Sequence, residues 1–273
     1  MHRSFLYAPG HNAKLLERVY GGGADAIVLD LEDAVPAVAK ETARKMVAAA
    51  LETRPAWVRV NDARTQLCAA DLDAVAGRAL GIRLPKVESA EEVQWVADRV
   101  PGVPVICAVE SARGLLAASE IASVDAVRRL SIGNVDLRHD THAGEGNLQT
   151  LYARSHLVFV SSAADLEPPI DSVYPHTHDL RALRADAEFA RSLGFFGKSV
   201  IHPCQVPVVH GVFTYSEEEV AWANEVIDAF ESSGGEALRL PSGEFVGAPI
   251  AHRARRLLER ARVLRPDDVR PAA

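Results

Sequence analysis

The sequence predicts a closed barrel of eight alternating strands and helices, a (β/α)8 fold, followed by a helical extension. Eight short β-rich runs recur between Ser4 and His202, and segments of helical periodicity separate them. The first strand-to-helix turn, APGHN, lacks the GxGxxG fingerprint of a doubly wound dinucleotide-binding sheet. The 273 residues suffice for one such barrel and a short extension. We expect the barrel at residues 1–212 and the extension at residues 213–273.

The expected strands are short and rich in apolar and β-branched residues. They are Ser4–Ala8, Ala26–Leu31, Trp57–Val60, Ile82–Pro85, Val103–Val109, Arg129–Ile132, Ile170–Tyr174 and Ser199–His202. Between them, apolar residues recur at positions i, i+3, i+4 and i+7, for example over residues 43–51 and 72–80. This alternation of strand and helix predicts a parallel sheet whose outer face is covered by helices.

Two further helical segments follow the eighth strand, near Ser216–Ser232 and Ala248–Val263. Ser216 with Glu219 forms a capping-box pattern at the start of the first. The second carries an apolar stripe, which needs a surface to bury it; the stripe consists of Ile250, Ala254, Leu257, Leu258 and Ala261. We expect this helix to pack on a neighbouring subunit of a homo-oligomer, most simply a trimer, with packing on its own barrel as the alternative.

Composition excludes several classes of protein. With 48% hydrophobic and 25% charged residues the chain is of globular type, and its net charge of −7 without a run of five like charges is not that of a nucleic-acid binder. No apolar stretch approaches the roughly 20 residues of a membrane span. Three cysteines without CxxC spacing predict neither a disulfide framework nor a zinc site. We therefore expect a cytoplasmic protein with a small-molecule partner.

Polar residues that directly follow an apolar strand are the candidate functional residues, because barrel enzymes place their chemistry at the carboxyl ends of the strands. Glu110 and Asp136 follow neighbouring strands, which lie about 4.8 Å apart, so both carboxylates can reach one hard cation. Mg²⁺ suits them, since it takes one or two carboxylates and keeps several waters. The alternative is that either residue is a helix cap or a surface carboxylate on its loop.

Arg59, in the motif VRVN, is a strand-end guanidinium suited to bind a substrate carboxylate or phosphate, and a structural salt bridge to Glu32 or Asp33 is the alternative. Schiff-base chemistry at a lysine is disfavoured. Lys198 precedes the eighth strand, and Lys86 has enough acidic neighbours to be an ordinary ion-pair partner.

Eight motifs in order carry a family resemblance: RSFLYAPG, DAIVLDLED, VRVN, LPKVES, VESARG, GNVDL, LYARS and GKSVIHPCQ. The chain resembles the citrate lyase beta-subunit and malyl-CoA lyase branch of the HpcH/HpaI aldolases, from about Arg3 to His210. The resemblance implies a TIM barrel of the phosphoenolpyruvate/pyruvate type and Mg²⁺ held by Glu110 and Asp136. It also implies that Arg59 anchors the keto-acid carboxylate, that Glu32 and Asp33 support metal-bound waters and Arg59, and that the segment Gly133, Asn134 and Val135 contacts the substrate.

The activity implied by this resemblance is Mg²⁺-dependent carbon–carbon cleavage of a β-hydroxyacyl-CoA, such as citryl-, malyl- or citramalyl-CoA, to an acyl-CoA and a 2-oxo acid. One position departs from the family. Its C-terminal segment usually carries an aspartate that handles the proton of the acyl carbon, but here Gly247 stands at that place, with Glu244 nearby. Two alternatives therefore stay open: a weakened barrel that binds an oxo acid or CoA ester in a regulatory role, and a CoA thioesterase.

Overall fold

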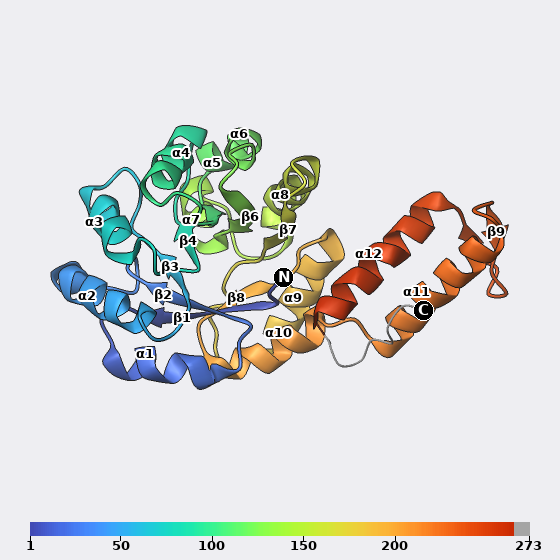
Figure 1. Cartoon of the computed structure of the whole chain (residues 1–273), viewed down its shortest axis with the longest axis horizontal. Helices are drawn as coiled ribbons and strands as arrows, with labels where there is room; N and C mark the ends of the chain where they lie inside the picture. Colours follow the sequence, from blue (N-terminus) through green and yellow to red (C-terminus); the bar gives the residue numbers. More distant parts are fainter. Residues whose placement is uncertain (265–273) are drawn as a thin grey trace. The chain divides into compact units, whose positions relative to one another are not determined.

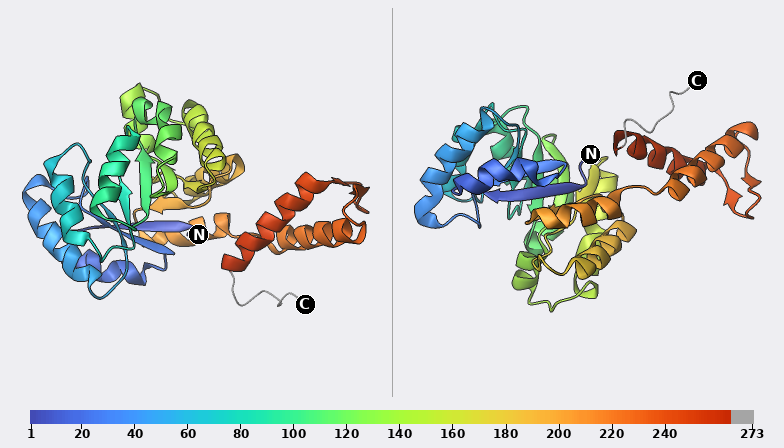
Figure 2. Two further views of the ribbon diagram at one scale, coloured as in Figure 1. Left: turned by 45° about the horizontal axis from the view of Figure 1, so that its top comes forward. Right: turned by 90° about the horizontal axis from the view of Figure 1, so that it is seen from below.

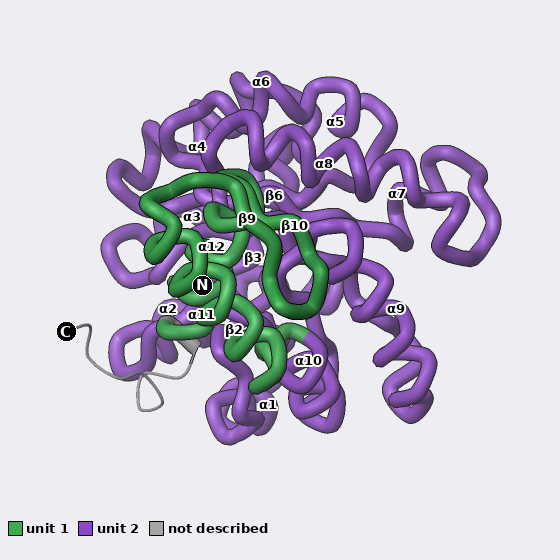
Figure 3. Tube along the Cα trace, turned by 90° about the vertical axis from the view of Figure 1, so that its right-hand side faces the viewer, with its two compact units in different colours: residues 1, 213–273 green, residues 2–212 purple. Residues whose placement is uncertain are grey.

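A computed structural model describes residues 1–264 of the chain; residues 265–273, which belong to the expected extension, lie outside the described residues. The chain divides into two compact units (Figure 3). One unit consists of residues 2–212, and the other of residue 1 with residues 213–273.

The larger unit is built on a sheet of eight parallel strands in the order β7-β6-β5-β4-β3-β2-β1-β8 (Figure 1). A bridge between Asp171 and Lys198 joins the two outer strands, so the sheet curls into a barrel. This confirms the predicted fold class. The strands are β1 (Ser4–Pro9), β2 (Ala26–Asp30), β3 (Trp57–Arg59), β4 (Gly81–Leu84), β5 (Val105–Val109), β6 (Val127–Ile132), β7 (Glu167–Ile170) and β8 (Lys198–Val200).

Helices surround the barrel (Figure 2) and connect successive strands. They are α1 (Ala13–Arg18), α2 (Lys40–Leu51), α3 (Gln66–Val75), α4 (Ala90–Arg99), α5 (Ala112–Leu116), α6 (Ala118–Ala122), α7 (Asn134–Thr141), α8 (Leu151–Ala163), α9 (Leu180–Leu193) and α10 (Val206–Phe213), with short 3₁₀ turns at Val19–Gly22, Ala37–Ala39, Leu148–Thr150 and Pro203–Gln205. In the described part of the chain, no helix has both the length and the apolar character that crossing a bilayer requires.

An apolar cluster lies inside the barrel, near the amino-terminal ends of most strands. It consists of Phe5, Ala26, Val28, Trp57, Ile106 and Ile170, with Tyr7 packed against it. Trp57 fills space that the neighbouring strand leaves open at Gly81, where an added Cβ would lie 2.1 Å from the indole ring. This cluster packs the barrel interior away from the carboxyl ends of the strands, where most of the polar side chains described below lie.

The smaller unit is a pair of helices joined by a two-stranded hairpin: α11 (Glu217–Ser232), β9 (Leu238–Arg239), β10 (Phe245–Val246) and α12 (Ala248–Leu264). The predicted capping box at Ser216 is present. The apolar stripe of α12 packs against α11: Ala254 is buried, and Ile250, Leu257 and Leu258 contact the same cluster. The stripe is thus covered within the extension itself, and the neighbouring subunit stays a prediction.

Candidate functional site

Arg59 lies at the end of β3, where acidic residues of the preceding strand and loop hold it. The parallel register places Asp30 beside Arg59, and the Asp30 carboxylate accepts two hydrogen bonds, from Nε and Nη2, both of 2.7 Å. Nη1 lies 2.9 Å from Oε2 of Glu32. A guanidinium has five N–H groups, and two of them donate to Asp30, so Nη1 and Nη2 retain N–H groups for a further ligand. The salt bridge to Glu32 is therefore present, a longer one of 3.7 Å joins Nη1 to Oδ2 of Asp33, and the shorter contact with Asp30 is not evident from the sequence.

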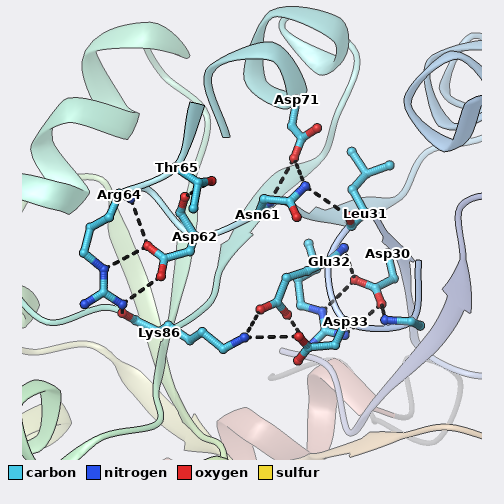
Figure 4. A network of polar contacts seen from close by, with 12 residues as sticks. Asp30, Leu31, Glu32, Asp33, Asn61, Asp62, Arg64, Thr65, Asp71 and Lys86 are labelled. Atoms are coloured by element: carbon cyan, nitrogen blue, oxygen red, sulfur yellow. Dashed lines mark hydrogen bonds and ion pairs between the residues drawn. The ribbon is translucent and has the colours of Figure 1, made fainter. Parts of the chain in front are cut away.

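Lys86 connects the end of β4 to the same acidic loop (Figure 4). Its Nζ lies 2.5 Å from Oε1 of Glu32 and 3.1 Å from Oδ1 of Asp33. Lys86 has a φ of 53°, a left-handed conformation that costs free energy for a non-glycine residue and is over-represented at functional sites. Burial raises the pKa of Glu32 despite the charge of Arg59. As expected from the sequence, Lys86 is an ion-pair partner.

The backbone of the acidic loop is fixed by Lys40, the first residue of α2. Its Nζ donates to the carbonyl oxygens of Leu31 and Glu32 and to Oδ1 of Asn61, each at 2.7 Å. Asn61 in turn donates to the Leu31 carbonyl and is held by Asp71 of α3 (Figure 4). Nothing in the sequence pattern singled out Lys40 or Asp71, because their partners are loop carbonyls and an amide that only the tertiary fold brings together.

Glu110 follows β5 and Asp136 lies in the first turn of α7, directly after the neighbouring strand β6. Glu110 is only 8% exposed, and its Oε2 has no hydrogen-bond partner among the described residues. Burial, together with the charges of Glu32 and Asp136, raises the pKa of Glu110 to about 8 against the opposing charges of Arg59 and Arg83. A buried carboxyl with a bare oxygen beside two other acids is an environment that a cation would stabilise.

Gly133 makes room for this carboxyl. A Cβ at residue 133 would lie 2.4 Å from Cγ and 2.7 Å from Oε1 of Glu110, and both distances are shorter than non-bonded contacts allow. The backbone N–H of Asn134 donates to Oγ of Ser172, just beyond β7, while its own Oδ1 is buried without a partner in the described chain. Val135 is 53% exposed. The segment from Gly133 to Asp136 is therefore positioned by contacts to Glu110 on one side and Ser172 on the other.

These residues fit Mg²⁺. The described residues contain no group of three or more His, Cys, Asp or Glu side chains arranged to hold a metal, as a structural zinc site would need. Magnesium is usually bound by one or two carboxylates, with water and substrate oxygens completing the octahedron. Glu110 and Asp136 can supply that pair, and the bare Oε2 of Glu110 is an available ligand oxygen.

Lys198 differs from its predicted place. It is the first residue of β8 rather than a residue before it, and it is fully buried. Its Nζ pairs with Asp171, which follows β7, and lies 2.6 Å from Oδ2 of Asp186 in α9, while Arg154 of α8 contacts the same two acids. Two carboxylates hold the buried ammonium of this lysine, so it is a structural group. The pattern of a short strand with a polar first residue does not reveal this network, because both acids come from other elements.

In the smaller unit, Gly247 begins the turn into α12, and its carbonyl accepts from the N–H groups of Ile250 and Ala251. A Cβ there would meet only ordinary contacts, 3.6 Å from the ring of Phe245. Oε2 of Glu244 accepts a 2.9 Å hydrogen bond from the indole of Trp222 in α11. Glu244 is thus engaged by its own unit, which weighs against its use as a substitute acid.

Comparison with known proteins identifies the family of the chain. The family model described as HpcH/HpaI aldolase/citrate lyase matches residues 3–203. The chain belongs to this family. A (3S)-malyl-CoA thioesterase from Cereibacter sphaeroides is 36% identical over 96% of this chain and 95% of its own length, and the citrate lyase subunit beta of Escherichia coli is 32% identical over 95% and 93%. Protein CitE from Mycobacterium tuberculosis, solved with magnesium, acetoacetate and coenzyme A, has a TM-score of 0.82 and 30% identity, covering 95% of this chain and 98% of that chain.

Proposed function

We propose that this HpcH/HpaI-family protein is a Mg²⁺-dependent carbon–carbon lyase that cleaves or forms a β-hydroxyacyl-CoA, with an acyl-CoA and a 2-oxo acid as the other side of the reaction. The observation that carries the proposal is the buried Glu110 carboxyl with its unpartnered oxygen, within the electrostatic influence of Asp136, Arg59 and Arg83. Support comes from the CitE structure, which contains magnesium together with acetoacetate and coenzyme A.

Each residue would have a defined part. Glu110 and Asp136 would hold the ion, and Mg²⁺, when bound, would polarise the oxygen on the carbon whose bond is made or broken, an effect worth several kcal/mol. Arg59, held rigid by Asp30, would direct its remaining N–H groups at the carboxylate of the 2-oxo acid. Glu32 and Asp33 would keep Arg59 and Lys86 in place and accept hydrogen bonds from water around the ion.

Arg59 also explains why the substrate would enter in one orientation. A planar guanidinium fixed on one side by a carboxylate can bind a second carboxylate only along its free edge. The backbone of Gly133, Asn134 and Val135 would border the opposite side, where Asn134 has a buried amide oxygen without a described partner.

Thioester hydrolysis is the second candidate, and Gly247 favours it. The family's C-terminal aspartate is absent here, and loss of an acid or base group typically costs about 10²–10⁴-fold in rate. A relative named (3S)-malyl-CoA thioesterase is 36% identical to this chain. Hydrolysis breaks the C–S bond instead of a C–C bond, so it does not need a group that delivers a proton to the acyl carbon.

Product analysis separates the two. The full-length protein is incubated with Mg²⁺ and malyl-, citramalyl- or citryl-CoA, and the products are identified by mass spectrometry. A lyase yields acyl-CoA and the oxo acid, whereas a thioesterase yields free CoA and the intact hydroxy acid. Formation of neither product, together with Mg²⁺-dependent binding of these ligands, would favour a regulatory barrel instead.

Two further parts of the proposal concern the assembly and its location. We expect a homo-oligomer, most simply a trimer, in which the extension approaches a neighbour. Phe245 in the hairpin is 58% exposed and is the type of side chain that an interface buries. The expected cytoplasmic location is compatible with the three free cysteines.

A further inference from the structure

Arg83 is a buried cation inside the barrel that the proposed mechanism does not use. It lies on β4 directly beside Arg59 in the parallel register, and it is only 4% exposed. Nη2 donates to Oγ of Ser199 at 3.0 Å, and Nη1 has no hydrogen-bond partner in the described part of the chain. No carboxylate of the described residues forms an ion pair with Arg83, so its charge is uncompensated by direct contact. An uncompensated buried charge is costly in free energy.

The other arginines inside this unit, unlike Arg83, have carbonyl or carboxylate partners. Arg129, also inside the barrel, donates to the carbonyl oxygens of Pro168 and Phe196. Arg154 pairs with Asp171 and Asp186, and the partly buried Arg59 is bound by Asp30 and Glu32. Only for Arg83 is the described set of partners limited to one hydroxyl and an aromatic ring, the ring of Tyr7 at 5.3 Å.

The position of Arg83 relates it to the candidate site. Both Arg59 and Arg83 lie over the ring of Tyr7, at 5.1 and 5.3 Å from its centroid. On the next strand, Ile106 is the register partner of Arg83 and faces the barrel core, as its cluster shows. Side chains alternate along a strand, so Ala108 and then Glu110 face the same interior above it. Because Ala108 is small, β5 places little side-chain volume between Arg83 and Glu110.

We propose that Arg83 binds a second carboxylate of the ligand, so that the site prefers a 2-oxo dicarboxylate over a 2-oxo monocarboxylate. This inference rests on the proposed function and specifies its substrate class. The first carboxylate and the oxo group lie with Arg59 and the metal residues, and the second carboxylate extends down the barrel to the free Nη1 edge of Arg83. Binding there supplies the missing counter-charge, and the hydrogen bond to Ser199 fixes the orientation of the guanidinium.

The test compares two ligands that share one carbon skeleton. Oxaloacetate and 2-oxobutanoate differ in that the terminal carboxylate of the first is a methyl group in the second. Both are titrated calorimetrically into the full chain with Mg²⁺, in the cold so that oxaloacetate does not decarboxylate. A charge-assisted hydrogen bond is worth enough that we expect oxaloacetate to bind about ten- to hundredfold more tightly.

Substitutions test whether Arg83 causes the preference for oxaloacetate over 2-oxobutanoate. Arg83→Met, which keeps an unbranched side chain of similar length, should abolish the preference by weakening oxaloacetate alone. Ser199→Ala, a milder change, should reduce it several-fold and serves if Arg83→Met does not fold. Arg78→Met, on an exposed loop, is the matched control and should change neither affinity.

The outcomes are distinguishable. Equal affinity of the parent for both ligands would overturn the role of Arg83 and leave the proposed function intact. Equal weakening of both ligands in Arg83→Met and Ser199→Ala would show a purely structural role. Failure of the parent to bind either ligand in a Mg²⁺-dependent manner would overturn the proposed function and this inference together.

Discussion

Replacing Gly133 with alanine should damage the metal site without touching a metal ligand. The added Cβ would lie 2.4 Å from Cγ of Glu110, which is not the free end of that side chain, so the carboxyl as a whole must move. Overpacking of this kind costs about 1–3 kcal/mol. If the bound state requires the original position of Glu110, that cost appears as Mg²⁺ affinity about 5- to 140-fold weaker, since 1.4 kcal/mol corresponds to a factor of ten.

The assay is calorimetric titration of Mg²⁺ into Gly133→Ala and into Gly144→Ala. Gly144 is exposed, and a Cβ there meets no atom within 4 Å, so the control makes the same chemical change without the clash. Circular dichroism establishes that both variants are folded. If Gly133→Ala binds Mg²⁺ as tightly as Gly144→Ala does, then the position of Glu110 does not determine metal binding and the reasoning is wrong.

Four more substitutions test Arg59, the C-terminal segment and Asp25. Arg59→Lys should weaken the binding of pyruvate, glyoxylate and oxaloacetate about tenfold or more, measured by calorimetry, because an ammonium retains the charge but not the fork that Asp30 orients. Gly247→Asp should raise the rate of malyl-, citramalyl- or citryl-CoA cleavage by up to about 10²–10⁴-fold, whereas Glu244→Gln should leave it unchanged because that side chain is bound to Trp222. Asp25→Asn should lower the free energy of unfolding by about 1–3 kcal/mol at neutral pH, measured with urea.

The effect at Asp25 has a defined pH dependence. Burial alone would raise the pKa of Asp25, but hydrogen bonds from Arg3 and His210 hold it well below its usual value. A pKa that is lower in the folded state stabilises the protein above the unfolded value of about 4, and that stabilisation is lost as the pH falls through the folded pKa. The difference between parent and Asp25→Asn should therefore shrink below about pH 4, and a difference independent of pH would contradict it.

Two further results would contradict the predictions for Arg59 and for the C-terminal segment. If Arg59→Lys binds the oxo acids as well as the parent does, Arg59 is structural. Rapid cleavage of a family substrate by the parent, unaffected by Glu244→Gln, would show that neither position of the C-terminal segment supplies the proton.

Much of the barrel could be predicted because strand and helix alternate with short, polar connections. The placement of Glu110 and Asp136 follows from that order alone, since consecutive parallel strands are neighbours and their carboxyl ends meet at one end of the barrel. The sequence predicts the seventh strand at Ile170–Tyr174, but β7 spans Glu167–Ile170, because two prolines within it are untypical of strands.

The partners of the site residues were harder to predict than the residues themselves. Asp30 is the main partner of Arg59 because the register sets them side by side, and a single strand does not reveal its register. The inward position of Arg83 is not evident from the sequence for a related reason. Its strand is buried on both faces, so the alternation of polar and apolar residues that would show which side chains face inward is absent.

The proposal that Glu110 and Asp136 hold Mg²⁺ is tested most directly by Mg²⁺ titration. The parent, Glu110→Gln and Asp136→Asn are titrated in the presence and absence of pyruvate. Each substitution removes one negative ligand oxygen while keeping the shape of the side chain. Both variants should lose most of their Mg²⁺ affinity and, with it, the Mg²⁺-dependent binding of pyruvate, while their unfolding remains cooperative. Unchanged Mg²⁺ affinity in both variants would contradict the proposal.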